Sequence, residues 1–468
     1  MYKFKLSFIN KFINLKYFLI LSLISYIKSS NIYAFDLIEA YDAALIFNAD
    51  YLSQVAQNNR DQEPQNQSRA RLLPQLSANT SFNQSYLETP DVGGIGANTG
   101  GFDIFHQTNF ALNITQVAFD FAKFSEYTKN KYQASVANLS LQNATNNLIL
   151  SVASAYFDVL YSNDIVLATR SKKTAFEQEM IASEKKFNAG IVNINDYKDA
   201  TASFDSANAE LIVAENDLID KQNTFKNLTG LNPDLIKSIN DQILLETPKP
   251  NSLDEWLKIA ENNNLSIKIT NKQLDMANED INIQKSGHLP NINLTGQYAY
   301  NGSKILDKVD SRTLNNVPGA LGSSYSQASV GVVINIPLYY GGLINSKVRE
   351  SIANYENIKA QNLSIKRKVN QDVINSFWRV YNGVNLVKAQ NTALKSAALK
   401  LDSDKLAYQL GTRTSIDLVN SQNNYYLVLQ KYNKSRYDYL LAVLKLNYDA
   451  GIITKQILKE INLNVIQE

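Results

Sequence analysis

The chain contains no cysteine, which excludes disulfide bonds, metal sites built on thiolates and lipid attachment at an N-terminal cysteine. It has only two histidines, His106 and His288, which are too few for a histidine metal cluster. The formal net charge is only +2, so no strongly basic surface for nucleic acid is indicated. We therefore expect no metal, no cofactor and no nucleic-acid partner.

Long apolar runs are also scarce. The run at residues 17–27 is shorter than the roughly 20 residues of a membrane-spanning helix, and it follows four lysines, at positions 3, 5, 11 and 16. A basic flank, a short apolar core and the small residue Ala34 predict a secretory signal peptide over 1–34. The alternative is an N-terminal membrane anchor. After this segment no long uncharged apolar stretch follows, so the mature protein, beginning near Phe35, is expected to have no transmembrane helix.

Glycine and proline are missing from four long stretches, 121–189, 191–229, 343–410 and 412–450, apart from Gly383. Strong helix formers fill these stretches, and Tyr425, Tyr432 and Tyr439 recur at the seven-residue interval of coiled coils. At about 1.5 Å per residue, a helix of nearly 70 residues spans on the order of 100 Å. Gly190 and Gly411 are therefore predicted to lie at the tips of helical hairpins.

The two halves of the chain repeat each other. Gly190 and Gly411, Asp196 and Asp417, and Gly230 and Gly451 are each separated by 221 residues. A repeat of this size predicts that one structural unit was duplicated and that the copies pack side by side. We assign the first repeat to 35–245 and the second to 246–451, and we leave 452–468 as a C-terminal tail.

Two strands are predicted in each repeat, near 75–87, 108–117, 290–301 and 326–337. Apolar and polar residues alternate along each of them. In the last strand, for example, the apolar residues Ala328, Val330, Val332, Ile334 and Ile336 are set against Gln327, Ser329, Gly331 and Asn335. Strands of about ten residues with this alternation are typical of outer-membrane barrels. Polar, glycine-rich loops at 88–101 and 302–324 join the paired strands. The alternative is a soluble β-sandwich with one solvated face.

Four strands cannot close a membrane barrel, because the smallest natural ones have about eight. An open edge in lipid would leave backbone groups unpaired at several kcal/mol each. Three copies would supply twelve strands, enough for a water-filled lumen. The predicted fold is therefore mixed: an all-α tunnel of long antiparallel coiled-coil-like helices plus a β-barrel to which each chain of a homotrimer contributes four strands.

Several motifs occur in a fixed order along the chain: LLPQL at 72–76, AYF at 155–157, GHLP at 287–290, IPLYYGG at 336–342 and YQLGTRTSID at 408–417. With these motifs, over about 36–451, the chain resembles the TolC family of trimeric outer-membrane efflux and secretion channels.

The resemblance implies a homotrimer in the cell outer membrane, in contact with its lipid, with a twelve-stranded barrel continued by a periplasmic helical tunnel. It also implies an equatorial region, to which the tail 452–468 contributes. Such channels dock an inner-membrane pump or ABC transporter through a periplasmic adaptor (membrane fusion) protein, as in efflux and type I secretion. They export drugs, proteins or both, and they are not enzymes.

The resemblance also implies roles for residues at the two tips. Arg413 and Tyr408 match residues that bond to Asn195 and Asp196 and hold the periplasmic entrance closed; arginine suits this role because its planar fork binds several acceptors. Asp417 matches an acidic ring at the pore entrance. The alternative for Arg413 is an ordinary solvated residue.

Two further points follow from the tip motif. A second acidic ring is missing, because Asn420 occupies its position, which should weaken the preference for cations. Gly190, Ile191, Gly411 and Thr412 match the places where adaptors dock, although a tight turn alone also explains the glycines.

Two other functions remain to be weighed. A non-transport periplasmic or surface coiled-coil scaffold explains the helices but not the four strands with a membrane pattern. A passive porin explains the strands but does not need helices on the order of 100 Å long.

Overall fold

The structure is a computed structural model that describes residues 34–89, 101–240, 243–308 and 324–465. The predicted signal peptide at 1–34 lies outside the described residues except for Ala34, as do most residues of the loops predicted at 88–101 and 302–324. No helix in the described part of the chain is both long enough and apolar enough to cross a membrane.

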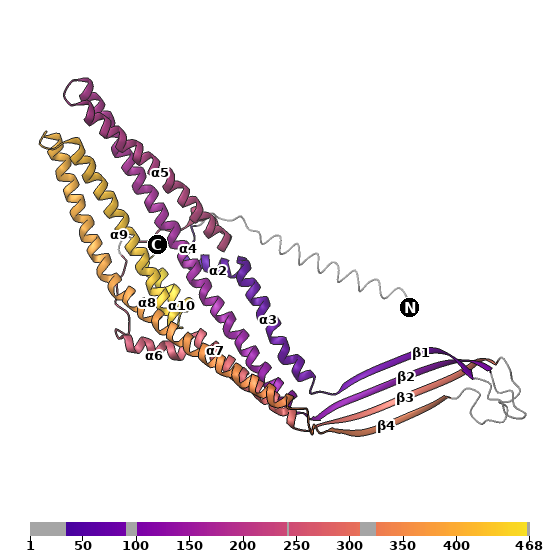
Figure 1. Ribbon diagram of the computed structural model, residues 1–468. Coiled ribbons are helices and arrows are strands. Elements are labelled where there is room, and N and C mark those ends of the chain that lie inside the picture. Colours follow the sequence, from indigo (N-terminus) through magenta and orange to yellow (C-terminus); the bar gives the residue numbers. More distant parts are fainter. Residues whose placement is uncertain (1–33, 90–100, 241–242, 309–323, 466–468) are drawn as a thin grey trace, which may run out of the picture. The chain divides into compact units, whose positions relative to one another are not determined.

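The same order of elements occurs twice (Figure 1). The first half contains α2 (Leu37–Phe47), α3 (Ala49–Ala70), β1 (Gln75–Thr89), β2 (Gly101–Phe119), α4 (Phe121–Asn188) and α5 (Ile194–Thr229). The second contains α6 (Leu253–Asn263), α7 (Leu265–Lys285), β3 (Asn291–Lys308), β4 (Ser324–Asn335), α8 (Leu343–Gln409) and α9 (Ser415–Asp449), followed by α10 (Lys455–Val465). Short 3₁₀ turns are η1 (Pro233–Leu235) and η2 (Ser286–His288).

The long helices have nearly equal lengths in the two halves. α4 has 68 residues and α8 has 67, while α5 has 36 and α9 has 35. Gly383 does not interrupt α8, and a side chain there would come within 3.3 Å of Cδ2 of Tyr439. The absence of helix breakers therefore correctly predicted these four helices.

Two compact units make up the chain, and each is described by itself. The bundle unit contains the described residues of Met1–Leu52, Ala144–Asn262 and Asn370–Glu468; the sheet unit contains those of Ser53–Asn143 and Asn263–Val369. Each unit takes segments from both halves of the chain, so the compact units are not the repeats predicted from the sequence. The assignment of repeats to 35–245 and 246–451 stays a prediction.

In the sheet unit, four antiparallel strands pair in the order β1-β2-β3-β4. Leu76, Ile114, Gly296 and Val330 lie opposite one another in one cross-strand row, and the next row is Ser77, Asn113, Gln297 and Ser329. Because side chains alternate between the faces of a strand, one face is apolar and the other carries amides and hydroxyls. On the polar face Gln297 donates a hydrogen bond to Asn113 at 3.0 Å.

β2 and β3 are longer than predicted. The predicted strands at 108–117 and 290–301 extend in the structure to Gly101–Phe119 and Asn291–Lys308. The added segments pair with each other, with Asp103 opposite Lys308. The added residues of β3 belong to the loop predicted at 302–324 on the basis of its polarity, but ladder hydrogen bonds join backbone groups and do not require apolar side chains.

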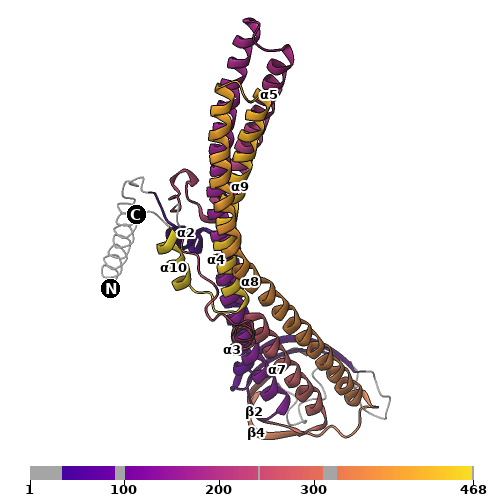
Figure 2. The same ribbon diagram turned by 90° about the vertical axis from the view of Figure 1, so that its left-hand side faces the viewer.

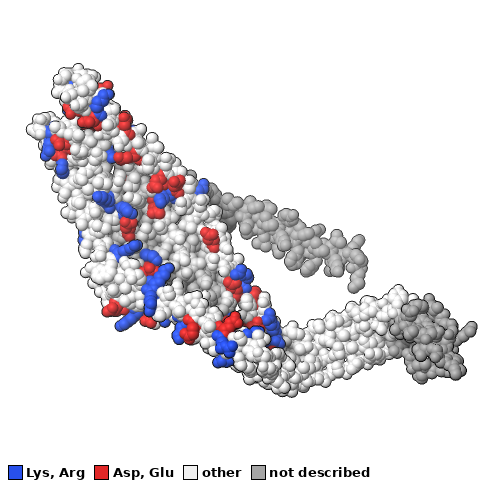
Figure 3. Space-filling view, in the orientation of Figure 1, with Lys and Arg blue, Asp and Glu red and all other residues white. Residues whose placement is uncertain are grey.

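No Lys, Arg, Asp or Glu occurs among the strand side chains that the structure describes. Figure 3 shows the consequence: charged residues gather over the helices, whereas the described part of the sheet is uncharged on the face in view. β1 and β4 form the edges of the sheet and each pairs on one side only within the chain.

The bundle unit is built from two helical hairpins, α4 with α5 and α8 with α9 (Figure 2). Phe176 of α4, Ala207 of α5 and Val419 of α9 form one of its core clusters. Elsewhere in the unit, α10 packs on α2: the Lys455 ammonium donates to Asp42 at 2.6 Å, and the Leu458 side chain is fully buried. Full burial of a leucine stabilises the fold by about 1.5–3 kcal/mol.

Candidate functional site at the helix tips

Both hairpins turn in the same way. At the first tip the amide of Gly190 donates to the Phe187 carbonyl and that of Ile191 to the Lys186 carbonyl, both at 2.9 Å. At the second tip Gly411 and Thr412 repeat these two bonds with the carbonyls of residues 408 and 407. This pair of bonds is the Schellman cap, which places a left-handed residue after the helix.

The backbone angles explain the glycines. Gly190 has a φ of +67° and Gly411 a φ of +75°, and an added Cβ would meet no heavy atom within 4 Å at either position. Glycine is therefore required by the left-handed conformation and not by close packing. This supports the interpretation as tight turns, and adaptor docking at these glycines, Ile191 and Thr412 stays a prediction.

Asp417 has a local role at the start of α9. Thr414 is the N-cap residue: its backbone N–H donates to the Asp417 carboxylate at 3.2 Å, and its hydroxyl accepts from the Asp417 backbone N–H at 3.3 Å. This reciprocal pair is a capping box. The hydrogen bonds from the backbone and the hydroxyl of Thr414 lower the pKa of the Asp417 carboxyl below its usual value.

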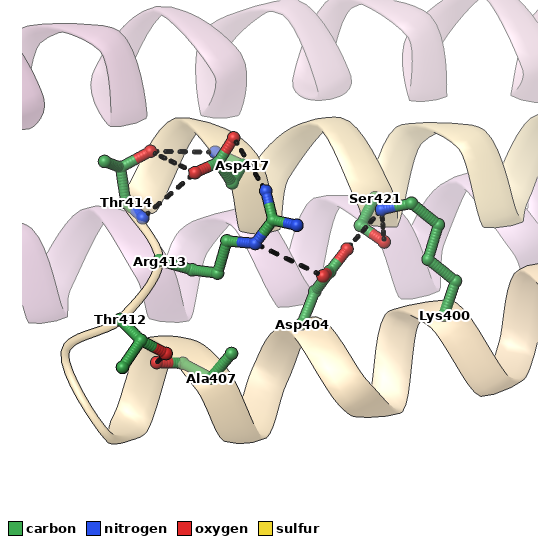
Figure 4. Close-up of polar contacts among 8 residues, drawn as sticks. All are labelled: Lys400, Asp404, Ala407, Thr412, Arg413, Thr414, Asp417 and Ser421. Carbon is green, nitrogen blue, oxygen red and sulfur yellow. Dashed lines mark hydrogen bonds and ion pairs between the residues drawn. The ribbon is translucent and has the colours of Figure 1, made fainter.

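Arg413 lies between the two helices of its own hairpin (Figure 4). Its guanidinium is 3.9 Å from the Asp404 carboxylate on α8 and 3.8 Å from the Asp417 carboxylate on α9. Asp404 also accepts from Lys400, and this hydrogen bond, followed by one from Ser421, lowers the pKa of its carboxyl. Arg413 therefore bridges α8 and α9 electrostatically.

Tyr408 connects the second hairpin to the first. Its hydroxyl donates to Oε1 of Glu179 on α4 at 2.5 Å and accepts from Nζ of Lys186 at 2.8 Å. The Lys186 ammonium also lies 4.0 Å from the centre of the Tyr408 ring. Burial, and next the hydrogen bond to Glu179, raise the pKa of the Tyr408 hydroxyl.

Glu179 is the centre of this contact, which we call the Glu179 latch and define as Glu179, Lys186, Tyr408 and Ser415. Glu179 is only 7% exposed, and its Oε1 also accepts a hydrogen bond from the Ser415 hydroxyl at 2.7 Å. Hydrogen bonds to a charged group contribute roughly 1.5–3 kcal/mol. The latch therefore holds α4 against both α8 and the start of α9.

The predicted gate residues are only partly brought together within one chain. Tyr408 does contact the first hairpin, but through Glu179 and Lys186. Among the described residues, neither Tyr408 nor Arg413 forms a hydrogen bond or ion pair with Asn195 or Asp196. Asn195 is exposed and Asp196 is half-buried at the start of α5. A single chain does not test contacts between copies, so the gate assignment stays a prediction.

Sequence reasoning missed Glu179, Lys186 and the role of Ser415. One signal could have found Glu179: it lies 221 residues before Lys400, so equivalent positions of the two hairpins carry opposite charges. Asn420, which replaces the second acidic residue, lines a groove of about 380 Å³ with Phe176 and Ser203 of the first hairpin. The acidic ring at Asp417 stays a prediction.

Comparison with known protein sequences points to one family. The profile of the family described as outer membrane efflux proteins matches residues 40–231 and 256–450, one segment in each half of the chain. The chain is 30% identical over 434 residues to outer membrane protein TolC of Salmonella enteritidis, covering 91% of this chain and 84% of that protein. It is 22% identical over 442 residues to alkaline protease secretion protein AprF of Pseudomonas aeruginosa, covering 93% and 88% of the two chains.

Solved structures show the same fold at lower identity. The outer membrane protein VceC of Vibrio cholerae superposes with a TM-score of 0.71 at 16% identity, covering 89% of this chain and 96% of that one. The CmeC outer membrane channel of Campylobacter jejuni superposes with a TM-score of 0.72 at 14% identity, covering 92% and 89%.

Proposed function

Because this chain belongs to the outer membrane efflux protein family, we propose that three copies of it assemble into a twelve-stranded barrel continued by a gated helical tunnel. The protein is an export channel of the outer membrane. The family is one of channels and not of enzymes. The proposal concerns the number of copies, the closure of the barrel, the gate and the partners.

The observation that carries the proposal is the sheet. It has an apolar face, a polar face that is uncharged among the described side chains, and two edges, β1 and β4, that lack a partner on one side within the described chain. In lipid each unpaired backbone group costs several kcal/mol. Pairing β4 of one copy with β1 of the next would satisfy both edges, and three copies would close a ring of twelve strands. The apolar face would contact lipid and the polar face a water-filled lumen.

The tips would form the gate. The Glu179 latch holds the two hairpins of one chain together, and Arg413 holds α8 to α9. Within the proposed trimer, Arg413 and Tyr408 would also face Asn195 and Asp196 of a neighbouring copy. Asp417 would contribute one of three carboxylates around the entrance.

A periplasmic adaptor would dock at Gly190, Ile191, Gly411 and Thr412. Ile191 is 72% exposed and so offers an apolar side chain at the end of the first hairpin. The names of the relatives include protease secretion and efflux proteins, so an inner-membrane transporter or pump of that kind is the proposed partner behind the adaptor. The cargo would accordingly be a protein, a drug or both.

The mass and membrane location of the detergent-extracted protein test the proposal. We expect it in the outer-membrane fraction with about three times the mass of a chain, which is 52.5 kDa including the segment 1–34. A coiled-coil scaffold without transport activity would instead give a soluble protein with no conductance in planar bilayers. A monomer, or an inner-membrane location, would contradict the proposal.

A further inference from the structure

A cavity of about 400 Å³ lies in the sheet unit. It forms where the starts of α4 and α8 and the end of α7 meet strands β3 and β4 (Figure 1). This volume is within the range of sites that hold small organic molecules, roughly 300–1,000 Å³. Two motifs that carry the family resemblance, GHLP at 287–290 and IPLYYGG at 336–342, build much of the wall. They contribute Gly287, Leu289, Pro290, Pro337 and Tyr340.

The strand residues of the cavity place it on the polar face of the sheet. Asn291 of β3 and Asn335 of β4 both line the cavity, and they lie opposite each other in the register. Each is an even number of residues from the polar row that contains Gln297 and Ser329, so all four side chains lie on the same face. In the proposed trimer this face lines the lumen. The cavity therefore lies beside the path of the exported cargo.

Large apolar side chains surround the cavity, although the rest of this face carries mainly amides and hydroxyls. Leu289, Tyr340 and Leu343 are 42%, 55% and 53% exposed, and Phe121 is 39% exposed. Grouped apolar surface of this kind marks ligand-binding grooves, because a ring or an aliphatic chain that covers it is removed from water. The wall of the cavity therefore suits the apolar part of an organic molecule.

Gly287 brings the end of α7 close to the start of α8. A Cβ at this position would lie only 3.2 Å from Cγ2 of Ile344, so a larger residue would push the two segments apart. Beside it, Ser286 is 9% exposed, and its hydroxyl donates to the Ile283 carbonyl at 2.5 Å. This side of the cavity is therefore a packed wall.

Two charged residues line the cavity, Asp120 and Lys347. The Asp120 carboxylate accepts a hydrogen bond from the Lys123 backbone N–H at 3.3 Å and lies 3.6 Å from the Lys123 ammonium, so its charge is compensated. Lys347 is exposed and forms no hydrogen bond or ion pair with the residues that the structure describes. The cavity thus carries one uncompensated positive charge next to an apolar wall.

We propose that this cavity binds amphipathic organic anions, such as aromatic sulfonates and carboxylates, as they pass through the channel. The apolar part lies against Phe121, Tyr340 and Leu343, and the anionic group binds the Lys347 ammonium. The proposal rests on the export channel proposed above and names a class of cargo and the place in the lumen that holds it. Because Lys347 is exposed, binding is weak, which suits a channel that its cargo has to leave again.

Block of the current through single channels in planar bilayers tests the proposal, with naphthalene-2-sulfonate as the probe. We expect this anion to reduce the conductance of the wild-type channel as its concentration rises. Methanesulfonate has the charge without the rings, and naphthalene-2-sulfonamide has the rings without the charge. Neither should block at the same concentration, and equal block by either of them would overturn the proposal.

Substitution of Lys347 assigns the block to the cavity. Lys347→Met should raise the concentration needed for half block several-fold, as expected for the loss of one exposed charge pair, whereas Lys347→Arg should keep the block. The control is Lys368→Met, at another exposed lysine of α8 that lies 21 residues further along. That distance is on the order of 30 Å. Equal effects of Lys347→Met and Lys368→Met would overturn the proposal.

Protection of an introduced cysteine provides a second measurement, since the chain has no cysteine of its own. Naphthalene-2-sulfonate should slow the reaction of Leu343→Cys with a small methanethiosulfonate reagent. It should not slow the reaction of Asn354→Cys, an exposed position 11 residues further along α8 and on the same face of the helix.

The two levels of the argument fail in different ways. A wild-type protein that is monomeric or does not conduct would refute the channel proposed above. A conducting trimer that naphthalene-2-sulfonate does not block, or in which Leu343→Cys is not protected, would refute only this inference.

Discussion

Glu179 is only 7% exposed, and its carboxylate accepts hydrogen bonds from Tyr408 and Ser415. Replacing Tyr408 by Phe removes one of these donors, at a cost of roughly 1.5–3 kcal/mol. If the latch keeps the entrance narrow, Tyr408→Phe should enlarge the single-channel conductance in planar bilayers without reducing trimer yield. Adding Arg413→Ser should enlarge it further, because Arg413 bridges α8 and α9.

Two variants separate the contact seen within the chain from the one proposed between copies. Glu179→Leu should act like Tyr408→Phe, since it removes the acceptor. Asp196→Asn should enlarge the conductance only if Asp196 is a gate residue in the trimer. Wild-type conductance in the Tyr408, Arg413 and Glu179 variants alike would show that these are not gate residues.

Asp417 combines two roles that substitution can separate. Asp417→Asn removes the charge but keeps an oxygen that can accept from Thr414, so it should lower cation selectivity with α9 still capped. Asp417→Ala removes both the charge and the oxygen that accepts from Thr414, so it should lower cation selectivity and also weaken the cap of α9. Because Thr414 lowers the pKa of the Asp417 carboxyl, the carboxylate stays charged down to below the ordinary value of about 3.9. The cation preference of the wild type should therefore persist at pH 4.5, and reversal potentials in a salt gradient measure it.

At the scale of elements, the register of β4 makes a prediction about its two faces. Val330 lies in the apolar row and Ser329 in the adjacent polar row. Val330→Arg should impair assembly, by up to about 2–4 kcal/mol if the position lies near the bilayer midplane. Ser329→Arg should be tolerated, because it would face water in the lumen. Trimer yield in the outer membrane compares the two, and equal effects would mean that the faces are assigned wrongly.

α10 closes the bundle unit by packing on α2. Besides Lys455, Asn462 binds there: its side-chain oxygen accepts from the Leu37 backbone at 3.1 Å and its amide donates to Asp36 at 2.9 Å. Leu458 is fully buried whereas Leu463 is 71% exposed. Leu458→Ala should cost about 2–5 kcal/mol and Leu463→Ala less than about 0.5 kcal/mol. Thermal unfolding of the two variants measures the difference, and similar midpoints would show that α10 does not stabilise the unit.

At the scale of the whole molecule, charge is distributed unevenly, as Figure 3 shows. The described strand side chains carry no Lys, Arg, Asp or Glu, so the described part of the sheet should contribute little to ion selectivity. Gln297→Lys would add three positive charges to the lumen of the proposed trimer. We expect it to shift the reversal potential towards anions, and an unchanged reversal potential would mean that Gln297 does not line the lumen.

The helices and strands could be predicted because their causes are local. The absence of Gly and Pro leaves helix formers uninterrupted, and alternation along 326–337 marks the two faces of a strand. Gly190 and Gly411 marked the tips because a left-handed cap favours glycine. The family resemblance rested on short motifs of the same local kind.

Much less of the candidate site could be predicted, because its contacts join distant parts of the chain. Tyr408 and Glu179 are 229 residues apart, and nothing local to either residue selects the other. The pairing exists because α4 packs against α8 and α9 at the tip. The extension of β2 and β3 has the same origin, since a polar strand forms where a neighbouring backbone is present to bond it.

By itself the sequence determined the periodic elements, their repetition and the turns, because these follow from the conformational preferences of neighbouring residues. Only the tertiary structure decided that Arg413 lies between Asp404 and Asp417 and that Tyr408 reaches Glu179. Many other carboxylates along the chain are chemically equally able to accept from Arg413 or Tyr408. Packing chooses among them, because an ion pair or hydrogen bond forms only with the partner that the folded backbone brings within about 3–4 Å.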